Sequence, residues 1–226
     1  MDNEGRGSGT PDRFYFPKWT NRLGPLSALA AIGGLVYVVL IVTLVFGPES
    51  SGMGYAPEQP VPYSHALHVG EMGLDCRYCH NTVETGAQAS LPPAGTCMNC
   101  HKSVKPDSPL LEPVRRSFET GEPLPWRRVH DLPDFVYFDH SAHLNAGVGC
   151  VSCHGRVDRM EVVSQAEKLT MQWCLDCHRE PDEHLRPREQ VTNLAWRPEG
   201  DPAELGKRLH VEYDVTPSTD CATCHR

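Results

Sequence analysis

Every cysteine of this chain belongs to one short pattern, in which two residues separate two cysteines and a histidine follows the second. The pattern occurs five times in 226 residues and accounts for all ten cysteines. The five copies are Cys76-Arg77-Tyr78-Cys79-His80, Cys97-Met98-Asn99-Cys100-His101, Cys150-Val151-Ser152-Cys153-His154, Cys174-Leu175-Asp176-Cys177-His178 and Cys221-Ala222-Thr223-Cys224-His225. Any fold of this chain must therefore place five such elements.

The spacing within the pattern suits covalent attachment of haem. Cys-x-x-Cys-His is the signature of c-type haem attachment. The two thiols add to the two vinyl groups at one porphyrin edge, and the next residue then lies beneath the ring, where its imidazole can bind the iron. We therefore predict five covalently bound c-type haems, with the ten cysteines as attachment points. The proximal iron ligands are His80, His101, His154, His178 and His225.

Paired cysteines also serve other chemistries. A zinc site would require the copies to combine in even numbers and would leave the repeated histidine unexplained. Redox dithiols or five disulfides would leave the same histidines unexplained. Five copies with no cysteine left over favour haem.

Composition limits the fold and the class of partner. The formal charge of −8 argues against nucleic acid. Nineteen glycines and twenty prolines indicate a loop-rich chain, and about 36 residues per haem cannot build a normal core around five large cofactors. We therefore expect a mainly α fold with extensive loops and haems as the core. Short helices should begin near the motifs, longer helices should cover 156–172 and 201–210, a short strand 134–138, and surface connections 103–126 and 181–203.

One segment is long and apolar enough to cross a membrane. Residues 25–47 contain no charged side chain, and about 20 apolar residues span a bilayer core. The alternative, a cleaved signal peptide, has an apolar region of about 7–15 residues and a small-residue cleavage site, which fits less well. Possible interface aromatics are Phe14, Tyr15, Phe16, Trp19, Phe46 and Tyr55.

Charge sets the expected orientation of this segment. Basic residues precede it and are cytoplasmic by the positive-inside rule; they are Arg6, Arg13, Lys18 and Arg22. We thus expect a cytoplasmic segment over 1–24, a single transmembrane helix over 25–47, and a haem domain on the periplasmic side of a bacterial cytoplasmic membrane. Covalent haem attachment belongs to that same side, a general property of c-type cytochromes.

The remaining sequence repeats internally. YSHALHVGEMGLDCRYCH (63–80) and FDHSAHLNAGVGCVSCHG (138–155) share an aromatic residue, His-x-x-His and the attachment motif, and a second motif follows each. Repetition of this kind predicts small stacked modules. We divide the chain into an extended linker over 48–62, a first two-haem module over 63–125, and a three-haem region over 126–226.

The repeat also supplies second axial ligands, which low-spin electron-transfer haems commonly take from His or Met. The two His-x-x-His pairs are the leading candidates, because imidazoles three residues apart on a helical turn lie close together and can serve different irons. The candidates in order are His65, His68, His140, His143, His210 and His130, and the weaker ones are His184, Met160 and Met171. A methionine ligand would raise the potential of its haem.

Taken together, the single anchor, YSHALHVGEMGLDCRYCH, VHDLPDFVYFDHSAHLNAGVGCVSCHGRVDRMEVV and LTMQWCLDCHR resemble the pentahaem cytochrome c subunit of alternative complex III. The paired modules are also similar to class III multihaem cytochromes c. The resemblance covers roughly residues 20–226. It implies an electron-transfer subunit of a membrane quinol:acceptor oxidoreductase, with the His-x-x-His residues as bis-histidine ligands.

The implied partners are an iron–sulfur and molybdopterin-like subunit, polytopic quinol-binding subunits, a monohaem cytochrome c and a terminal oxidase. In that setting the chain is no enzyme by itself, because the redox chemistry belongs to the haems. One alternative is a small membrane-anchored quinol dehydrogenase that feeds a periplasmic reductase. Another is a multihaem reductase with an open iron, which the five regular motifs disfavour.

Overall fold

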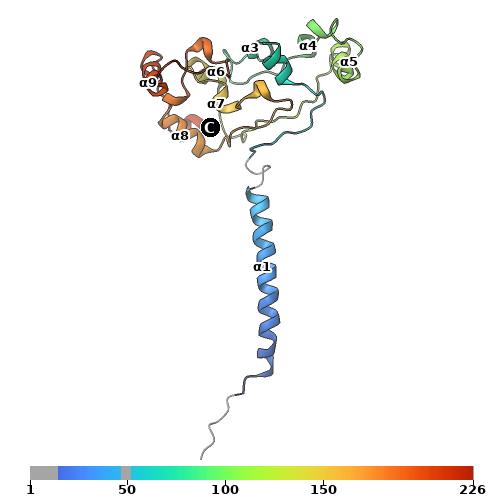
Figure 1. Cartoon of the computed structure of the whole chain (residues 1–226), viewed down its shortest axis with the longest axis vertical. Coiled ribbons are helices and arrows are strands. Elements are labelled where there is room, and N and C mark those ends of the chain that lie inside the picture. Colours follow the sequence, from blue (N-terminus) through green and yellow to red (C-terminus); the bar gives the residue numbers. More distant parts are fainter. Residues whose placement is uncertain (1–14, 47–51, 226) are drawn as a thin grey trace, which may run out of the picture. The chain divides into compact units, whose positions relative to one another are not determined.

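The computed structural model describes residues 15–46 and 52–225. The chain divides into two compact units, Met1–Gly47 and Pro48–Arg226. In the first, a 3-10 turn over Lys18–Arg22 leads into the long helix α1, Leu23–Phe46, drawn in blue in Figure 1. Of the residues named above for orientation and for the membrane interface, Arg6, Arg13 and Phe14 lie outside the described part, as does the side chain of Phe46. The start of the predicted linker, 48–51, lies outside it as well.

Helix α1 has the properties of a bilayer-spanning segment. The stretch Lys18–Val45 has a mean hydropathy of 2.7, and none of its most apolar window is buried against protein. Its hydroxyls bond within the helix: Ser27 Oγ donates to the carbonyl of Gly24, and Thr43 Oγ1 to that of Val39. Internal satisfaction of polar groups is what hydrocarbon demands. The predicted apolar helix is therefore confirmed as a helix that by length and composition could cross a membrane.

The second unit consists of short helices joined by long loops (Figure 1). A π-helical turn, η2, covers Ala66–Glu71 and follows His65. The α-helices are α3 Cys76–Cys79, α4 Ala94–His101, α5 Glu112–Thr120, α6 His140–Asn145, α7 Val151–His154, α8 Met171–Arg179, α9 Pro202–Glu212 and α10 Cys221–Cys224. Single 3-10 turns are η3 Pro109–Leu111, η4 Val157–Arg159, η5 Asp182–His184 and η6 Arg188–Gln190.

Local side chains decide where several of these helices begin. The carboxylate of Asp75 accepts from Arg77 N at the start of α3, and that of Asp139 accepts from Ser141 N at the start of α6. Thr170 caps α8 and Asp201 caps α9 in the same way. Such a cap satisfies an otherwise unpaired helical N–H and contributes about 1 kcal/mol. Helices too short to be stable alone are thereby fixed at the motifs.

Apolar packing in this unit is thin. One buried cluster joins Val61, Ala94 and Val114, and a second joins Leu185, Leu209 and Val215. Two clusters of this size are far less than a unit of this length normally buries. The described residues therefore leave room for a core that is not made of protein side chains.

The prediction of a mainly helical, loop-rich fold is confirmed, with helices beginning at or near each attachment motif. The expected helix over 201–210 is α9. Three details were wrong. Residues 156–172 form η4 and then extended chain, because α8 begins only at Met171. In 134–138 there is no strand but one bridge, between Val136 and His225. The supposed surface connection 103–126 contains α5, which buries Val114.

Candidate haem-binding sites

Each attachment motif lies in or at a short helix, and we number the five sites in chain order by their proximal histidines. Sites 1 to 5 carry His80, His101, His154, His178 and His225 and lie on α3, α4, α7, α8 and α10. All ten cysteines are described and none forms a disulfide. Burial raises the pKa of the Cys76 thiol to about 11 and that of Cys153 to about 12. The cysteines are thus unpaired thiols next to histidines, and all but the exposed Cys100 and Cys221 are half-buried.

Three proximal histidines face a second histidine at a common distance. The ring centres of His68 and His101 are 6.1 Å apart, those of His140 and His154 are 6.4 Å apart, and those of His143 and His178 are 6.0 Å apart. Two imidazoles on opposite sides of one metal place their centres about 6 Å apart, because each metal–nitrogen bond is about 2 Å long. The distances therefore fit one iron between each pair, at sites 2, 3 and 4.

The proximal imidazoles are oriented through Nδ1. Backbone carbonyls accept from His80 Nδ1 at 3.0 Å, from His101 at 3.0 Å, from His178 at 2.6 Å and from His225 at 3.3 Å. The accepting residues are Ser90, Val104, Ser218 and Phe135. Donation from Nδ1 fixes the tautomer and leaves the Nε2 lone pair for a metal.

The His-x-x-His residues are oriented in the same way. His68 Nδ1 donates to the carbonyl of Ser64 at 2.8 Å, and His143 Nδ1 to that of Asp139 at 2.7 Å, one turn back in each case. His140 Nδ1 donates to the carbonyl of Ala87, 53 residues earlier in the chain, at 2.9 Å. In these imidazoles too, donation from Nδ1 leaves the Nε2 lone pair for a metal.

One aromatic ring packs against both histidines of each pair. Tyr63 lies edge-on to His65 at 4.7 Å and stacks on His68 at 4.4 Å between ring centres. Phe138 lies edge-on to His140 at 4.8 Å and nearly stacks on His143 at 4.5 Å. The repeat seen in the sequence is thus a repeat in space, and its aromatic residue positions two imidazoles at once.

His65 carries a buried, unsatisfied nitrogen. Its Nδ1 has no hydrogen-bond partner among the described residues. Burial, together with the charges of His80 and His68, lowers the pKa of His65 to about 4. Burial likewise lowers the pKa of His154 to about 3. Neutral imidazoles that can bind iron, beside free thiols that can form thioether bonds to the porphyrin, are what a c-type haem requires, so these residues fit the group.

The five sites are neighbours in an order that differs from the chain order. Asn99 of site 2 donates to the hydroxyl of Tyr78 of site 1 at 3.1 Å. Residues 191 and 192 join sites 1 and 3, because Val191 O accepts from Cys150 N and Thr192 O accepts from Cys76 Sγ. Burial raises the pKa of the Cys79 and Cys76 thiols, and a nearby thiol of the neighbouring site adds to each shift: Cys97 to that of Cys79, and Cys150 to that of Cys76.

Sites 3, 4 and 5 continue this series. Helix α6 carries both His140 and His143, which face sites 3 and 4. Ser218, whose carbonyl holds His178 of site 4, lies three residues before Cys221 of site 5. Burial raises the pKa of the Cys153 and Cys174 thiols, and a thiol of the next site adds to each shift: Cys177 to that of Cys153, and Cys224 to that of Cys174. The spatial order is therefore 2–1–3–4–5.

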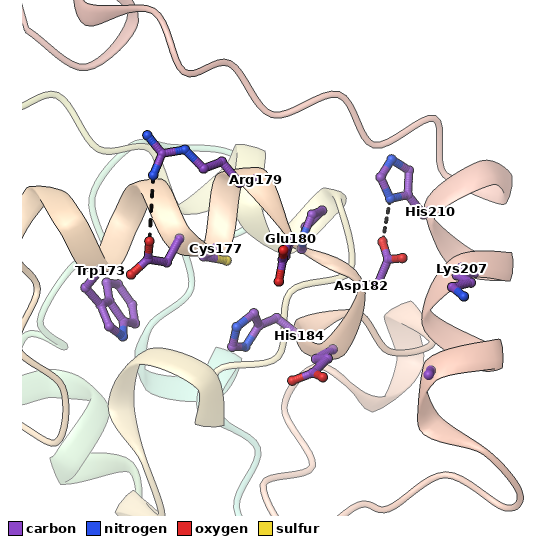
Figure 2. A pocket seen from close by; sticks show the side chains of 12 residues that line it. Trp173, Cys177, Arg179, Glu180, Asp182, His184, Lys207 and His210 are labelled. Carbon is purple, nitrogen blue, oxygen red and sulfur yellow. Dashed lines mark hydrogen bonds and ion pairs between the residues drawn. The ribbon is translucent and has the colours of Figure 1, made fainter.

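The other candidate ligands occupy different positions. His130 Nε2 lies 3.4 Å from His154 Nδ1. His184 and His210 line a pocket of about 520 Å³ with Cys177 of site 4 (Figure 2). Met160 Sδ accepts from Ser164 Oγ at 3.8 Å, and Met171 is 67% exposed at the start of α8.

Some residues that shape these sites were not found from the sequence. The backbone acceptors at Ser90, Val104 and Ser218 carry no sequence signal, because any residue supplies a carbonyl. Asp182 accepts from His210 Nδ1 at 2.5 Å and gave no signal either. Tyr63 and Phe138 did have one, since both open the repeated segments.

Comparisons with known proteins agree with this geometry. Residues 136–226 match the family described as cytochrome c7 and related cytochrome c. Over 132 residues the chain is 37% identical to a Nitratidesulfovibrio vulgaris protein described as menaquinone reductase, multiheme cytochrome c subunit. That match covers 55% of this chain and 60% of the relative. The second unit therefore contains a cytochrome c7-like multihaem domain, which implies covalently bound c-type haem.

Proposed function

We propose that this chain is the membrane-anchored pentahaem electron-transfer subunit of a respiratory quinol:acceptor oxidoreductase of the alternative complex III kind. It would be anchored by α1, with its N-terminus in the cytoplasm and its haem domain in the periplasm. The proposal extends to the domain limits given above, 1–24, 25–47, 48–62, 63–125 and 126–226. Bound haem supplies one-electron exchange at its iron; the chain's own part is to hold, space and tune the five irons.

The observation that carries this proposal is the set of histidine pairs at 6.0–6.4 Å. An iron with two imidazoles has no open position, so such sites exchange electrons and do not bind a substrate. We assign His65 with His80, His68 with His101, His140 with His154, His143 with His178, and His210 with His225. The last pairing rests on sequence position, since His210 precedes the fifth motif at a distance comparable to that of the His-x-x-His residues before theirs, whereas His130 Nε2 lies 3.4 Å from His154 Nδ1.

The spatial order gives the relay two ends. Site 2 and site 5 each have one neighbour in the series 2–1–3–4–5, and each has an exposed cysteine, Cys100 and Cys221. We propose that electrons enter and leave at these ends, where partner subunits can approach. Site 1 is first in sequence but lies inside the series.

Partners follow from the same reading. We propose polytopic quinol-binding subunits, an iron–sulfur and molybdopterin-like subunit, and a monohaem cytochrome c or terminal oxidase as acceptor. The name of the Nitratidesulfovibrio vulgaris relative favours a second candidate function, in which electrons pass along the five haems toward menaquinone. A small membrane-anchored quinol dehydrogenase is the third candidate.

The test is to purify the full chain gently in detergent with its native partners and to separate part of it as a single subunit. Anaerobic addition of a quinol should reduce the haems of the complex but not those of the separated chain. Oxidation of quinol by the separated chain would favour the quinol dehydrogenase instead. Reduction of menaquinone by the pre-reduced complex, with no quinol oxidation, would favour the second candidate function.

A further inference from the structure

One histidine among the candidate ligands differs from the others in its hydrogen-bond acceptor. His210 Nδ1 donates to a side-chain carboxylate, Asp182 Oδ1, at 2.5 Å. The other assigned ligands whose Nδ1 donates within the described residues use a backbone carbonyl or, for His154, the imidazole of His130. Figure 2 shows the carboxylate of Asp182 pointing at the ring of His210.

The backbone holds Asp182 in this position. It opens the turn η5, Asp182–His184, which packs against α9, and the carbonyl of Asp182 accepts from Leu185 N at 3.2 Å. A side chain at Gly206 of α9 would collide with that same carbonyl. Glycine at this point therefore lets α9 approach η5 closely enough for His210 to reach the carboxylate. Both side chains are about one-third exposed.

A carboxylate acceptor changes what the imidazole gives to a metal. It draws the Nδ1 proton and increases the electron density at Nε2, which raises the basicity of the ligand. Second-shell hydrogen bonding of this kind is one of the means by which a protein sets a haem potential. A more basic ligand stabilises ferric over ferrous iron, so the potential falls.

We propose that Asp182 is a positioning residue that makes His210 a strongly donating axial ligand and gives the haem it serves a lower potential than a carbonyl acceptor would. This inference rests on the proposed function, because it requires His210 to bind iron. It adds that one haem of the relay differs from the others in the group that accepts a hydrogen bond from its ligand, and not in the identity of its ligands.

The experiment is an EPR-monitored redox titration of the purified full chain with Asp182→Asn. Asparagine keeps the shape and can still accept from Nδ1–H, but it lacks the charge. We expect reduction of one haem to become about tenfold more favourable, the lower end of the 10–100-fold by which loss of such a hydrogen-bond partner changes metal affinity or activity; tenfold corresponds to about 59 mV for one electron. The other haem potentials should not move.

Matched variants make the result specific. Asp176→Asn removes an exposed carboxylate that lines the same pocket and bonds Gln172 and Arg179 but no histidine. Its titration should equal that of the unchanged protein. Asp182→Glu keeps the charge and should keep the affected potential close to the original. Asp182→Ala, which also removes the carboxylate from His210 Nδ1, serves in place of Asp182→Asn if that variant does not mature, and it should raise the same potential. His210→Ala should turn one haem high-spin.

The outcomes separate the two claims. Five low-spin haems with no shift in Asp182→Asn, or an equal shift in Asp176→Asn, would overturn the inference and leave the proposed function standing. A chain that keeps all its haems low-spin in His210→Ala would overturn the inference as well. A chain that carries no haem would overturn the proposed function itself.

Discussion

The imidazole rings of His140 and His154 lie nearly parallel, with 7° between their planes and 6.4 Å between their centres. His140 comes from α6 and His154 from α7, and their Nδ1 atoms contact the carbonyl of Ala87 and the imidazole of His130, respectively. In both rings this leaves the Nε2 lone pair for a metal. This is the arrangement of two axial ligands on one iron.

The first prediction concerns that pair. In His140→Ala, the haem of site 3 should stay attached through Cys150 and Cys153 but lose one axial ligand. Because a five-coordinate haem is high-spin and open, one haem per chain should become high-spin and bind CO when reduced. EPR and optical spectra measure both changes. His184→Ala is the control, and a high-spin haem there, or none in His140→Ala, would refute the pairing.

Tyr63 should support two sites at once. Its ring contacts both His65 and His68, so Tyr63→Ala should disturb the spectra of sites 1 and 2 together. The unfolding free energy should fall by about 1–3 kcal/mol, less than for a fully buried aromatic ring. Tyr63→Phe keeps the ring and should behave normally. Denaturant unfolding and low-spin EPR signals measure the two effects; a change confined to one haem would contradict the shared role.

Low pH should lower the free energy of unfolding, because it protonates Asp75. Hydrogen bonds from Arg77 hold the pKa of Asp75 at about 2, below its ordinary value. A lowered folded-state pKa stabilises the fold above the ordinary pKa near 4, and this contribution is lost as pH falls toward 2. Because the pair is partly exposed, we expect about 0.5–1 kcal/mol.

Substitutions at Asp75 separate charge from capping. Asp75→Asn retains the cap of α3 but should abolish this part of the pH dependence between pH 5 and 2. Asp75→Ala should cost about 1 kcal/mol more, because the cap is also lost. Asp107→Asn is the exposed control. The measurement is denaturant unfolding at several pH values, and parallel curves for Asp75→Asn and the unchanged protein would count against the assignment.

Helix α1 should anchor the chain. Leu35 and Val39 lie in the middle of the span and are exposed, and an arginine at a membrane centre costs about 2.5–3.5 kcal/mol. The unchanged chain should remain in the membrane fraction after an alkaline carbonate wash. The double change Leu35→Arg and Val39→Arg should release it or prevent its insertion, whereas Leu35→Phe with Val39→Ile should have no effect. Retention of the doubly charged variant would contradict a spanning role.

Much of the chemistry was predictable because it resides in short local patterns. The motif at Cys76–His80 fixes its own attachment geometry, and the repeat of His65 and His68 at His140 and His143 indicates paired sites. Three of the assigned pairs have the geometry expected for axial ligands. Apolar length alone predicted α1.

The remainder depends on contacts that a pattern does not record. Neighbouring sites are joined by residues far apart in the chain, as Thr192 is from Cys76, so the order 2–1–3–4–5 was not visible. Helix α5 was missed because charged residues surround Val114. The expected helix over 156–172 was wrong, since Thr170 caps α8 and places the helix start at Met171. Asp182 was missed because only folding brings it to His210.

The most direct test of the account is the number of haems covalently bound to one full-length chain. Intact-mass analysis of the denatured protein, with pyridine haemochrome absorbance against protein concentration, measures it. The account predicts five haems per chain and no cysteine that reacts with a thiol reagent. Two haems or fewer, with free thiols at the motifs, would contradict it.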